Sequence, residues 1–173
     1  MAQNDSISVE PATQADATLL ANLLELYIHD LSAAFRIEPG PDGRFGYPKL
    51  PLYWSEPEKR FAFLIRRAGR AIGFALVTRG SPATDDPDVW DIAEFFILRS
   101  YRRGGFGRRA AELLFERFPG RWLVRVCVGN LGALPFWQAV VSAYSSGRFT
   151  VREREGAPHA WRDLSFSTRD RGA

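Results

Sequence analysis

The feature that most constrains the fold is an apolar stretch, a glycine-rich turn and an amphipathic helix in direct succession. The stretch covers residues 89–98, and the turn reads Arg-Arg-Gly-Gly-Phe-Gly over 102–107. Apolar side chains at 110, 111, 114, 115 and 118 then share one face of a helix over 108–118. A second strand over 122–128 completes a strand–helix–strand unit, whose strands run parallel because the helix carries the chain back.

Hairpins and further helices surround this unit, so the sheet is not purely parallel. The pattern predicts a strand over 6–9, a helix from capping residues 13–16 to about 28–34, a hairpin over 61–66 and 71–79, a helix over 134–144, and a closing hairpin over 148–154 and 160–167. We expect an α/β fold of the α+β mixed-sheet kind, with a central mixed sheet and helices on both faces. With 173 residues and no linker or internal repeat, one domain over 1–173 is expected.

Cysteine and histidine are too rare for several classes of site. The chain has one cysteine, Cys127, and two histidines, His29 and His159, so neither a disulfide framework nor a metal centre is expected. Its first residues are polar, and no apolar run approaches the ~20 residues that span a bilayer. The sequence therefore predicts a cytoplasmic protein with no membrane partner.

Positive charge is concentrated in one part of the chain. The formal net charge is +3, and Lys49 and Lys59 are the only lysines among 23 basic residues. Residues 99–125 hold eight arginines against Glu112 and Glu116, a local charge of +6, which leaves −3 for the remainder. An overall preference for arginine explains the scarcity of lysine but not this clustering.

The glycine-rich turn predicts an anion site. Glycine allows positive φ and a close approach of the backbone, so several N–H groups can converge on one ligand at the helix N-terminus. Arg108 and Arg109 lie in the first helical turn, where the helix dipole favours acids, and a bound polyanion would remove that conflict. The alternative interpretation is a tight turn with solvated arginines.

Two polyanion motifs fit this turn. Gly105, Gly107 and Ala110 match a dinucleotide fingerprint, but the next strand ends in Gly129-Asn130 and lacks the acid that holds a ribose. The spacing Arg102-x-x-Gly105-x-Gly107 resembles motif A of the GCN5-related N-acetyltransferases (GNAT). Residues 130–137, Asn-Leu-Gly-Ala-Leu-Pro-Phe-Trp, resemble motif B of that family. One helix and one strand separate the two motifs, as in the family, and the resemblance covers about residues 6–167.

The resemblance implies acetyl-CoA (coenzyme A) as the cofactor. Its pyrophosphate would lie on the turn, and backbone groups of Ile97 and Leu98 would pair with the pantetheine. Asn130 would contact the pantetheine or hold open a gap between strands, and Phe136 and Trp137 would pack near the cofactor. The residues implied for the turn are Arg102, Arg103, Gly104, Gly105, Phe106, Gly107 and Arg108.

Transfer of acetyl to an amine needs a base, since a protonated amine has no lone pair. Glu94 is the first candidate, because it lies in the apolar run 92–97, where desolvation raises a carboxyl pKa, and because it resembles a glutamate of several family members. Asp91 is a weaker substitute. Glu94 could instead pair with an arginine or face water. Trp137 stands where many members have a tyrosine that protonates the leaving thiolate. Tyr144, seven residues on and so on roughly the same side of the helix, is therefore the candidate acid. Departure without an acid is the alternative.

The acceptor is expected to be a primary amine of a small molecule or peptide, which attacks directly in a ternary complex. Aromatic side chains and an acid before residue 55 suit a cationic amine, and the candidates are Tyr27, Asp30, Phe45, Tyr47 and Trp54. A non-catalytic acyl-CoA-binding module and a dinucleotide-binding protein are the alternatives. No nucleic-acid partner is expected, and a homodimer is left open.

Overall fold

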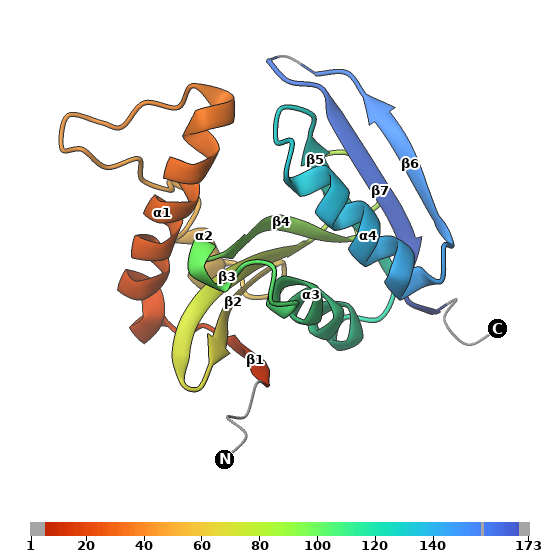
Figure 1. Ribbon diagram of the computed structural model, residues 1–173, viewed down its shortest axis with the longest axis horizontal. Coiled ribbons are helices and arrows are strands. Elements are labelled where there is room, and N and C mark those ends of the chain that lie inside the picture. The colour runs from red at the N-terminus through yellow and green to blue at the C-terminus, as the bar shows by residue number, and fades with distance from the viewer. Residues whose placement is uncertain (1–5, 157, 170–173) are drawn as a thin grey trace.

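The computed structural model describes residues 6–156 and 158–169 (Figure 1). Seven strands form one sheet in the order β1-β2-β3-β4-β5-β7-β6. The strands are β1 (Ile7–Pro11), β2 (Arg60–Arg67), β3 (Arg70–Arg79), β4 (Trp90–Ile97), β5 (Arg121–Cys127), β6 (Phe149–Arg154) and β7 (Trp161–Ser167). Only β4 and β5 are parallel among these strands, so the expected mixed sheet is confirmed.

Four α-helices cover the sheet in the described residues, namely α1 (Ala17–Phe35), α2 (Leu52–Ser55), α3 (Phe106–Arg117) and α4 (Ala133–Ser145). Short 3-10 turns precede α1 at Gln14–Asp16 and follow β4 at Arg99–Tyr101. The one-turn helix α2 lies inside the segment that the sequence pattern left irregular. No helix in the described ranges is long and apolar enough to cross a bilayer.

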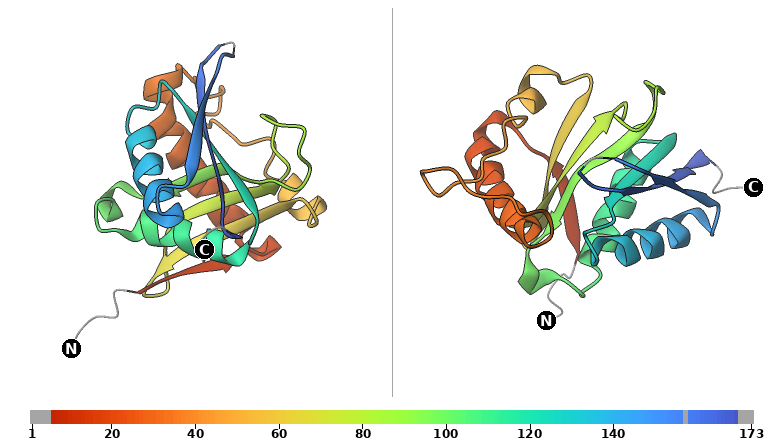
Figure 2. Two further views of the ribbon diagram at one scale, coloured as in Figure 1. Left: turned by 90° about the vertical axis from the view of Figure 1, so that its right-hand side faces the viewer. Right: turned by 90° about the horizontal axis from the view of Figure 1, so that it is seen from above.

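The helices lie on both faces of the sheet, as Figure 2 shows. Along β2, Ala62 and Leu64 pack with α1, whereas Phe63 packs with α3 and α4. This alternation is what a strand buried on both faces requires, because successive side chains point to opposite sides. The sheet therefore separates the apolar cluster under α1 from the clusters under α3 and α4.

The centre of the sheet opens where β4 and β5 part. These strands pair only at Trp90–Trp122, Asp91–Leu123 and Ile92–Val124, although both continue further. At the same level the register of β4 against β3 shifts, since Leu76 pairs with Glu94 and Val77 with Ile92. Ala93 is therefore an extra residue, a β-bulge that redirects the strand and the side chain of Glu94 after it.

Candidate active site

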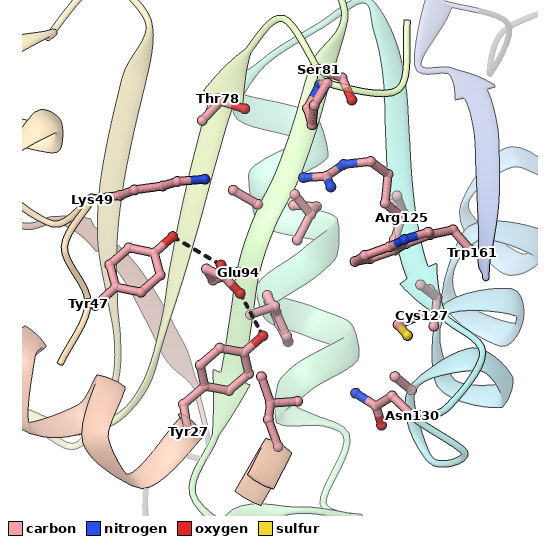
Figure 3. Close-up of a pocket in the computed structure, with 18 of the residues that line it drawn as sticks. Tyr27, Tyr47, Lys49, Thr78, Ser81, Glu94, Arg125, Cys127, Asn130 and Trp161 are labelled. Carbon is pink, nitrogen blue, oxygen red and sulfur yellow. Dashed lines mark hydrogen bonds between the residues drawn. The ribbon is translucent and has the colours of Figure 1, made fainter. Parts of the chain in front are cut away.

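A cavity of about 790 Å³ lies where β4 and β5 diverge. Its walls come from α1, from the segment before α2, from the ends of β3 and β5, and from the closing hairpin. Figure 3 shows Glu94 near its centre, with Tyr27 and Tyr47 on one side and Arg125 and Trp161 on the other. Asn130, at the turn before α4, also lines the cavity.

Glu94 is held by two phenols. Tyr27 Oη donates to Glu94 Oε2 over 2.6 Å, and Tyr47 Oη donates to Oε1 over 3.0 Å. Burial raises the pKa of Glu94 above its usual 4.5, and the two hydrogen bonds, with the positive charges of Arg125 and Lys49, offset part of that rise. A carboxyl with a raised pKa is better suited to accept a proton near neutral pH than an exposed one.

The phenols around Glu94 remain protonated. Burial and the nearby carboxylate raise the pKa of Tyr27 well above 10 and raise that of Tyr47 in the same direction. Burial also raises the pKa of Tyr53 to about 12. Tyr53 lines the cavity, and its buried hydroxyl makes no hydrogen bond to any described residue. The phenols of Tyr27 and Tyr47 thus act as donors that orient Glu94.

Arg125 and Asp91 form a buried ion pair beside Glu94. Arg125 Nε and Nη2 donate to Asp91 Oδ2 and Oδ1 over 2.6 and 3.0 Å, and Asp91 is fully buried. This bidentate pair occupies both oxygens of Asp91. Asp91, the weaker alternative to Glu94 as a base, is therefore part of a structural contact. Arg125 also lies over the Trp161 ring, 5.8 Å from its centroid, and this fixes the guanidinium at the cavity wall.

The glycine-rich turn leads into α3, which begins at Phe106, two residues earlier than the apolar pattern indicated. Gly105 caps the helix at φ +79°, and Arg103 has φ +65°. No described residue accepts a backbone hydrogen bond from Arg103, Gly104 or Gly105, and the first N–H groups of α3 have no partner within a helix. A Cβ at Gly107 would lie 3.3 Å from the Phe136 ring. The turn therefore presents a row of donors, and the first turn of α3 packs against Phe136 at Gly107.

Arg102 and Asp30 have different roles from those expected. Arg102 Nη2 lies 2.6 Å from Asp30 Oδ2, and its Nε donates to the Ile97 carbonyl over 2.8 Å. Arg99 binds the other oxygen of Asp30. The Asp30 carboxylate thus links α1 to the residues that follow β4, and it does not line the cavity. The Arg102 side chain is occupied by contacts within the protein.

The residues of β4 whose backbone groups face the gap toward β5 are not all those that were expected. Leu98 N–H donates to the Ile72 carbonyl over 2.9 Å, so it is not available to a ligand. Alternate residues of an antiparallel pair turn their backbone groups to the partner. In this register, Phe95 and the N–H of Ile97 therefore face the open side toward β5. The N–H of Ile97 thus faces the gap, and Phe95 rather than Leu98 shares this orientation.

The cluster of arginines is largely neutralised within the fold. Arg108 pairs with Glu112 over 2.8 Å, Arg109 lies near Glu112 and Glu116, and Arg121 pairs with Asp86 over 2.7 Å. With the pairs of Asp30 and Asp91, acids from distant parts of the chain compensate much of the local charge. The excess of positive charge over residues 99–125 thus serves long-range ion pairs as well as the glycine-rich turn.

Tyr144 lies in the hydrophobic core. It is 4% exposed and packs against Phe115 and Phe166, and it does not line the cavity. Trp137 lines the cavity and packs against Phe95 and Phe136. The helix position that suggested Tyr144 as an acid instead places it between α3 and β7.

The remaining acceptor candidates divide into two groups. Tyr27 and Tyr47 face the cavity, whereas Phe45 and Trp54 do not line it. Phe45 packs against His29, and Trp54 packs against the core under α1. Arg125 and Lys49 also line the cavity, and no sequence motif pointed to either of them. Arg125 carried the same signal as Glu94, a charge inside an apolar strand.

Among the described residues, no cluster of histidine, cysteine or acids could hold a metal ion.

Comparisons with known proteins agree with this architecture. The model of the acetyltransferase (GNAT) family matches residues 21–140. An acetyltransferase from Thermus thermophilus is 22% identical, with a TM-score of 0.69 over 92% of this chain and 96% of that one. No curated protein matches the chain.

Two other solved structures are similar in fold and contain coenzyme A. The aminoglycoside acetyltransferase AAC(6')-Ib with coenzyme A is 15% identical, with a TM-score of 0.70 over 95% of this chain and 96% of that one. Spermidine N-acetyltransferase from Vibrio cholerae, with CoA and spermine, is 12% identical, with a TM-score of 0.67 over 97% and 99%. The family match spans well over half of the residues, and this chain belongs to the GNAT family of acetyltransferases.

Proposed function

We propose that this protein transfers the acetyl group of acetyl-CoA to a primary amine of a small molecule or peptide, by direct attack in a ternary complex. One observation carries the proposal. A carboxyl with a raised pKa, Glu94, lies in a cavity at the gap between β4 and β5, next to the strand that leads into the donor-rich turn. Family membership supplies the reaction class.

The residues present fit an acyl-CoA. The turn at 103–108 offers backbone N–H groups and a helix N-terminus to a pyrophosphate. Phe95 and Ile97 turn peptide groups to the gap, where they would pair with pantetheine amides. Asn130 and Trp137 line the gap from the turn before α4 and from α4 itself. When bound, acetyl-CoA supplies an activated thioester.

In this proposal Glu94 accepts the proton of the acceptor amine. The amine nitrogen forms a bond to the acetyl carbon, the carbon–sulfur bond breaks, and the amine gives its proton to Glu94 directly or through water. Tyr27 and Tyr47 hold the carboxylate oxygens in place during this step. Since Tyr144 lies in the core, the leaving thiolate departs without it, which a thiol pKa of ~8.5 permits.

The first experiment is calorimetric titration with acetyl-CoA, CoA and NADH. We expect acetyl-CoA and CoA to bind and NADH not to bind. Absence of CoA binding contradicts the proposal, and binding of NADH alone supports a dinucleotide protein instead.

A thiol-release assay over a panel of amines then separates an enzyme from an acyl-CoA-binding module. Release of CoA that depends on the amine supports transfer, and binding without release supports the module. Glu94→Gln removes the base while keeping a hydrogen-bonding side chain. We expect it to lower kcat/KM about 100-fold or more, the scale of general base catalysis. An unchanged rate at every pH removes Glu94 from this role.

A further inference from the structure

The cavity carries more positive than negative charge. Its basic side chains are Lys49, Lys59, Arg60, Arg79 and Arg125, against only two acids, Glu56 and Glu94. Burial favours the neutral form of Glu94, which widens the imbalance. A site built for a polycationic amine would have the opposite charge, because buried or partly buried charges are paired with opposite ones.

Three of these cations already have partners. Arg60 pairs with Glu56 over 2.7 Å, Arg79 with Asp88, and Arg125 with Asp91. Within the described part of the chain, neither lysine has an ion-pair partner. They are also the only lysines in the sequence, and both line this one cavity. Among the basic side chains of the cavity, the two lysines are therefore the most available to a ligand.

Lys49 and Arg125 face each other across the cavity. Figure 3 shows the ammonium group of Lys49 and the guanidinium of Arg125 extending toward one another from opposite walls, with Glu94 beside the space between them. Both charges act on Glu94 and lower its pKa, which places them near the reacting centre. The contacts of Arg125 with Asp91 use Nε and Nη2 and hold the guanidinium in this orientation.

We propose that the acceptor is an amine that also carries a carboxylate, such as a free amino acid, with the carboxylate bound between Lys49 and Arg125 and the amine at Glu94. This inference rests on the proposed acetyl transfer and names the acceptor class of the same site. Charge-assisted contacts from two cations hold a carboxylate well. The aromatic walls of Tyr27, Phe95 and Trp161 leave space for an apolar side chain. The charge balance thus favours an acceptor that carries a carboxylate besides its amine over the purely cationic acceptor that was expected.

Lys49 is the side chain to test. It is exposed to the cavity and its substitution leaves the core intact, whereas removal of Arg125 would leave Asp91 buried without a partner. The variant is Lys49→Met, which keeps most of the apolar stem. Arg70→Met is the control for net charge, because Arg70 is exposed at the start of β3, and the cavity lies at the other end of that strand.

The assay compares phenylalanine and leucine, each with its amide and its decarboxylated amine, together with spermidine. The amines differ in basicity, so kcat/KM is expressed per neutral amine. We expect the amino acids to exceed their amides and amines by about 10- to 100-fold in the wild type and in Arg70→Met. In Lys49→Met this preference is expected to disappear. Equal rates within each series, a preference for spermidine, or a preference that survives Lys49→Met overturns the inference.

A binding measurement keeps this inference separate from the catalytic proposal. Calorimetry with CoA-loaded protein compares N-acetylphenylalanine with N-acetylphenylalaninamide. We expect the acid to bind about 10-fold or more tightly than the amide, and this difference to be lost in Lys49→Met. Equal binding of acid and amide contradicts the carboxylate site, even if amines are acetylated. Failure of CoA itself to bind contradicts the proposed function instead.

Discussion

Tyr27 and Glu94 lie 67 positions apart and meet in a 2.6 Å hydrogen bond between phenol and carboxylate. The bond joins α1 to β4 at the point where the bulge at Ala93 turns the strand. Because Tyr27 stays protonated, its hydroxyl donates this hydrogen bond to the carboxylate, and it favours the ionised form of Glu94. A side chain on the first helix therefore tunes the proposed base.

Tyr27→Phe is expected to move the acid limb of the kcat/KM profile to higher pH. Glu94 must be ionised to accept a proton, and activity falls as pH drops through its raised pKa. Loss of the Tyr27 hydrogen bond destabilises the ionised form, so the pKa rises further. Since a hydrogen bond to a charged group contributes about 1.5–3 kcal/mol, the limb is expected to move by about one pH unit or more. Rates per neutral amine, measured from about pH 5 to pH 9, check this.

Tyr53→Phe is the matched control for that profile. Its hydroxyl also lies at the cavity, but it makes no hydrogen bond to any described residue. We expect the acid limb to stay in place. A shift as large as that of Tyr27→Phe would mean that the limb does not report the hydrogen bond to Glu94.

Arg125→Met is expected to destabilise the protein by about 3–5 kcal/mol, because it leaves the carboxylate of Asp91 buried and uncompensated. The double variant Asp91→Asn with Arg125→Met removes both charges and is expected to recover most of the loss. Denaturant unfolding at neutral pH measures both. Equal destabilisation of the single and double variants would show that packing, not the stranded charge, sets the cost.

Gly105→Ala tests the turn that caps α3. At φ +79° with open space around it, an added Cβ meets no atom but strains the backbone by about 1–2 kcal/mol. We expect that loss of stability together with weaker CoA binding, since relaxation of the strain moves the donors. Gly43→Ala has φ +77°, also with open space, and lies outside the cavity lining. It is expected to show the stability loss in thermal unfolding but an unchanged Kd for CoA.

Gly73→Ala tests the close contact between β3 and β4. A Cβ at Gly73 would lie 2.1 Å from the carbonyl oxygen of Phe96, so the two strands must move apart. Overpacking typically costs about 1–3 kcal/mol, and this backbone contact is expected to reach at least the upper end. Thermal unfolding measures the loss. A change below about 1 kcal/mol would mean that the strands accommodate the methyl group with little movement.

Local patterns predicted much of this fold because they act on neighbouring residues. The apolar runs that became β2 to β5 and the helical spacing of α1, α3 and α4 are short-range signals. The bulge at Ala93 and the one-turn helix α2 left no such signal. Their presence depends on pairing with other strands and on packing over the sheet.

The candidate site could be picked out from the sequence where one motif marks it, and less so where distant residues meet. The turn at 102–107 and Glu94 could be picked out from their immediate neighbours. Asp30 was expected at the acceptor, yet its partners Arg99 and Arg102 come from the far end of β4. Tyr144 has the spacing of a cavity-facing residue but lies in the core. Pairings between residues so far apart in the chain are decided by topology, which local spacing does not encode.

The short pairing of β4 with β5 has a mechanical consequence. The sheet consists of two hydrogen-bonded ladders, β1 to β4 and β5 to β7, joined by only three residue pairs. A ligand that forms hydrogen bonds with the backbone of Phe95 and Ile97 and packs against α4 would connect the two ladders where β4 and β5 are not paired. Binding would then stiffen the joint between the ladders, and amide hydrogen exchange along residues 124–127 is where that stiffening is expected to be seen first.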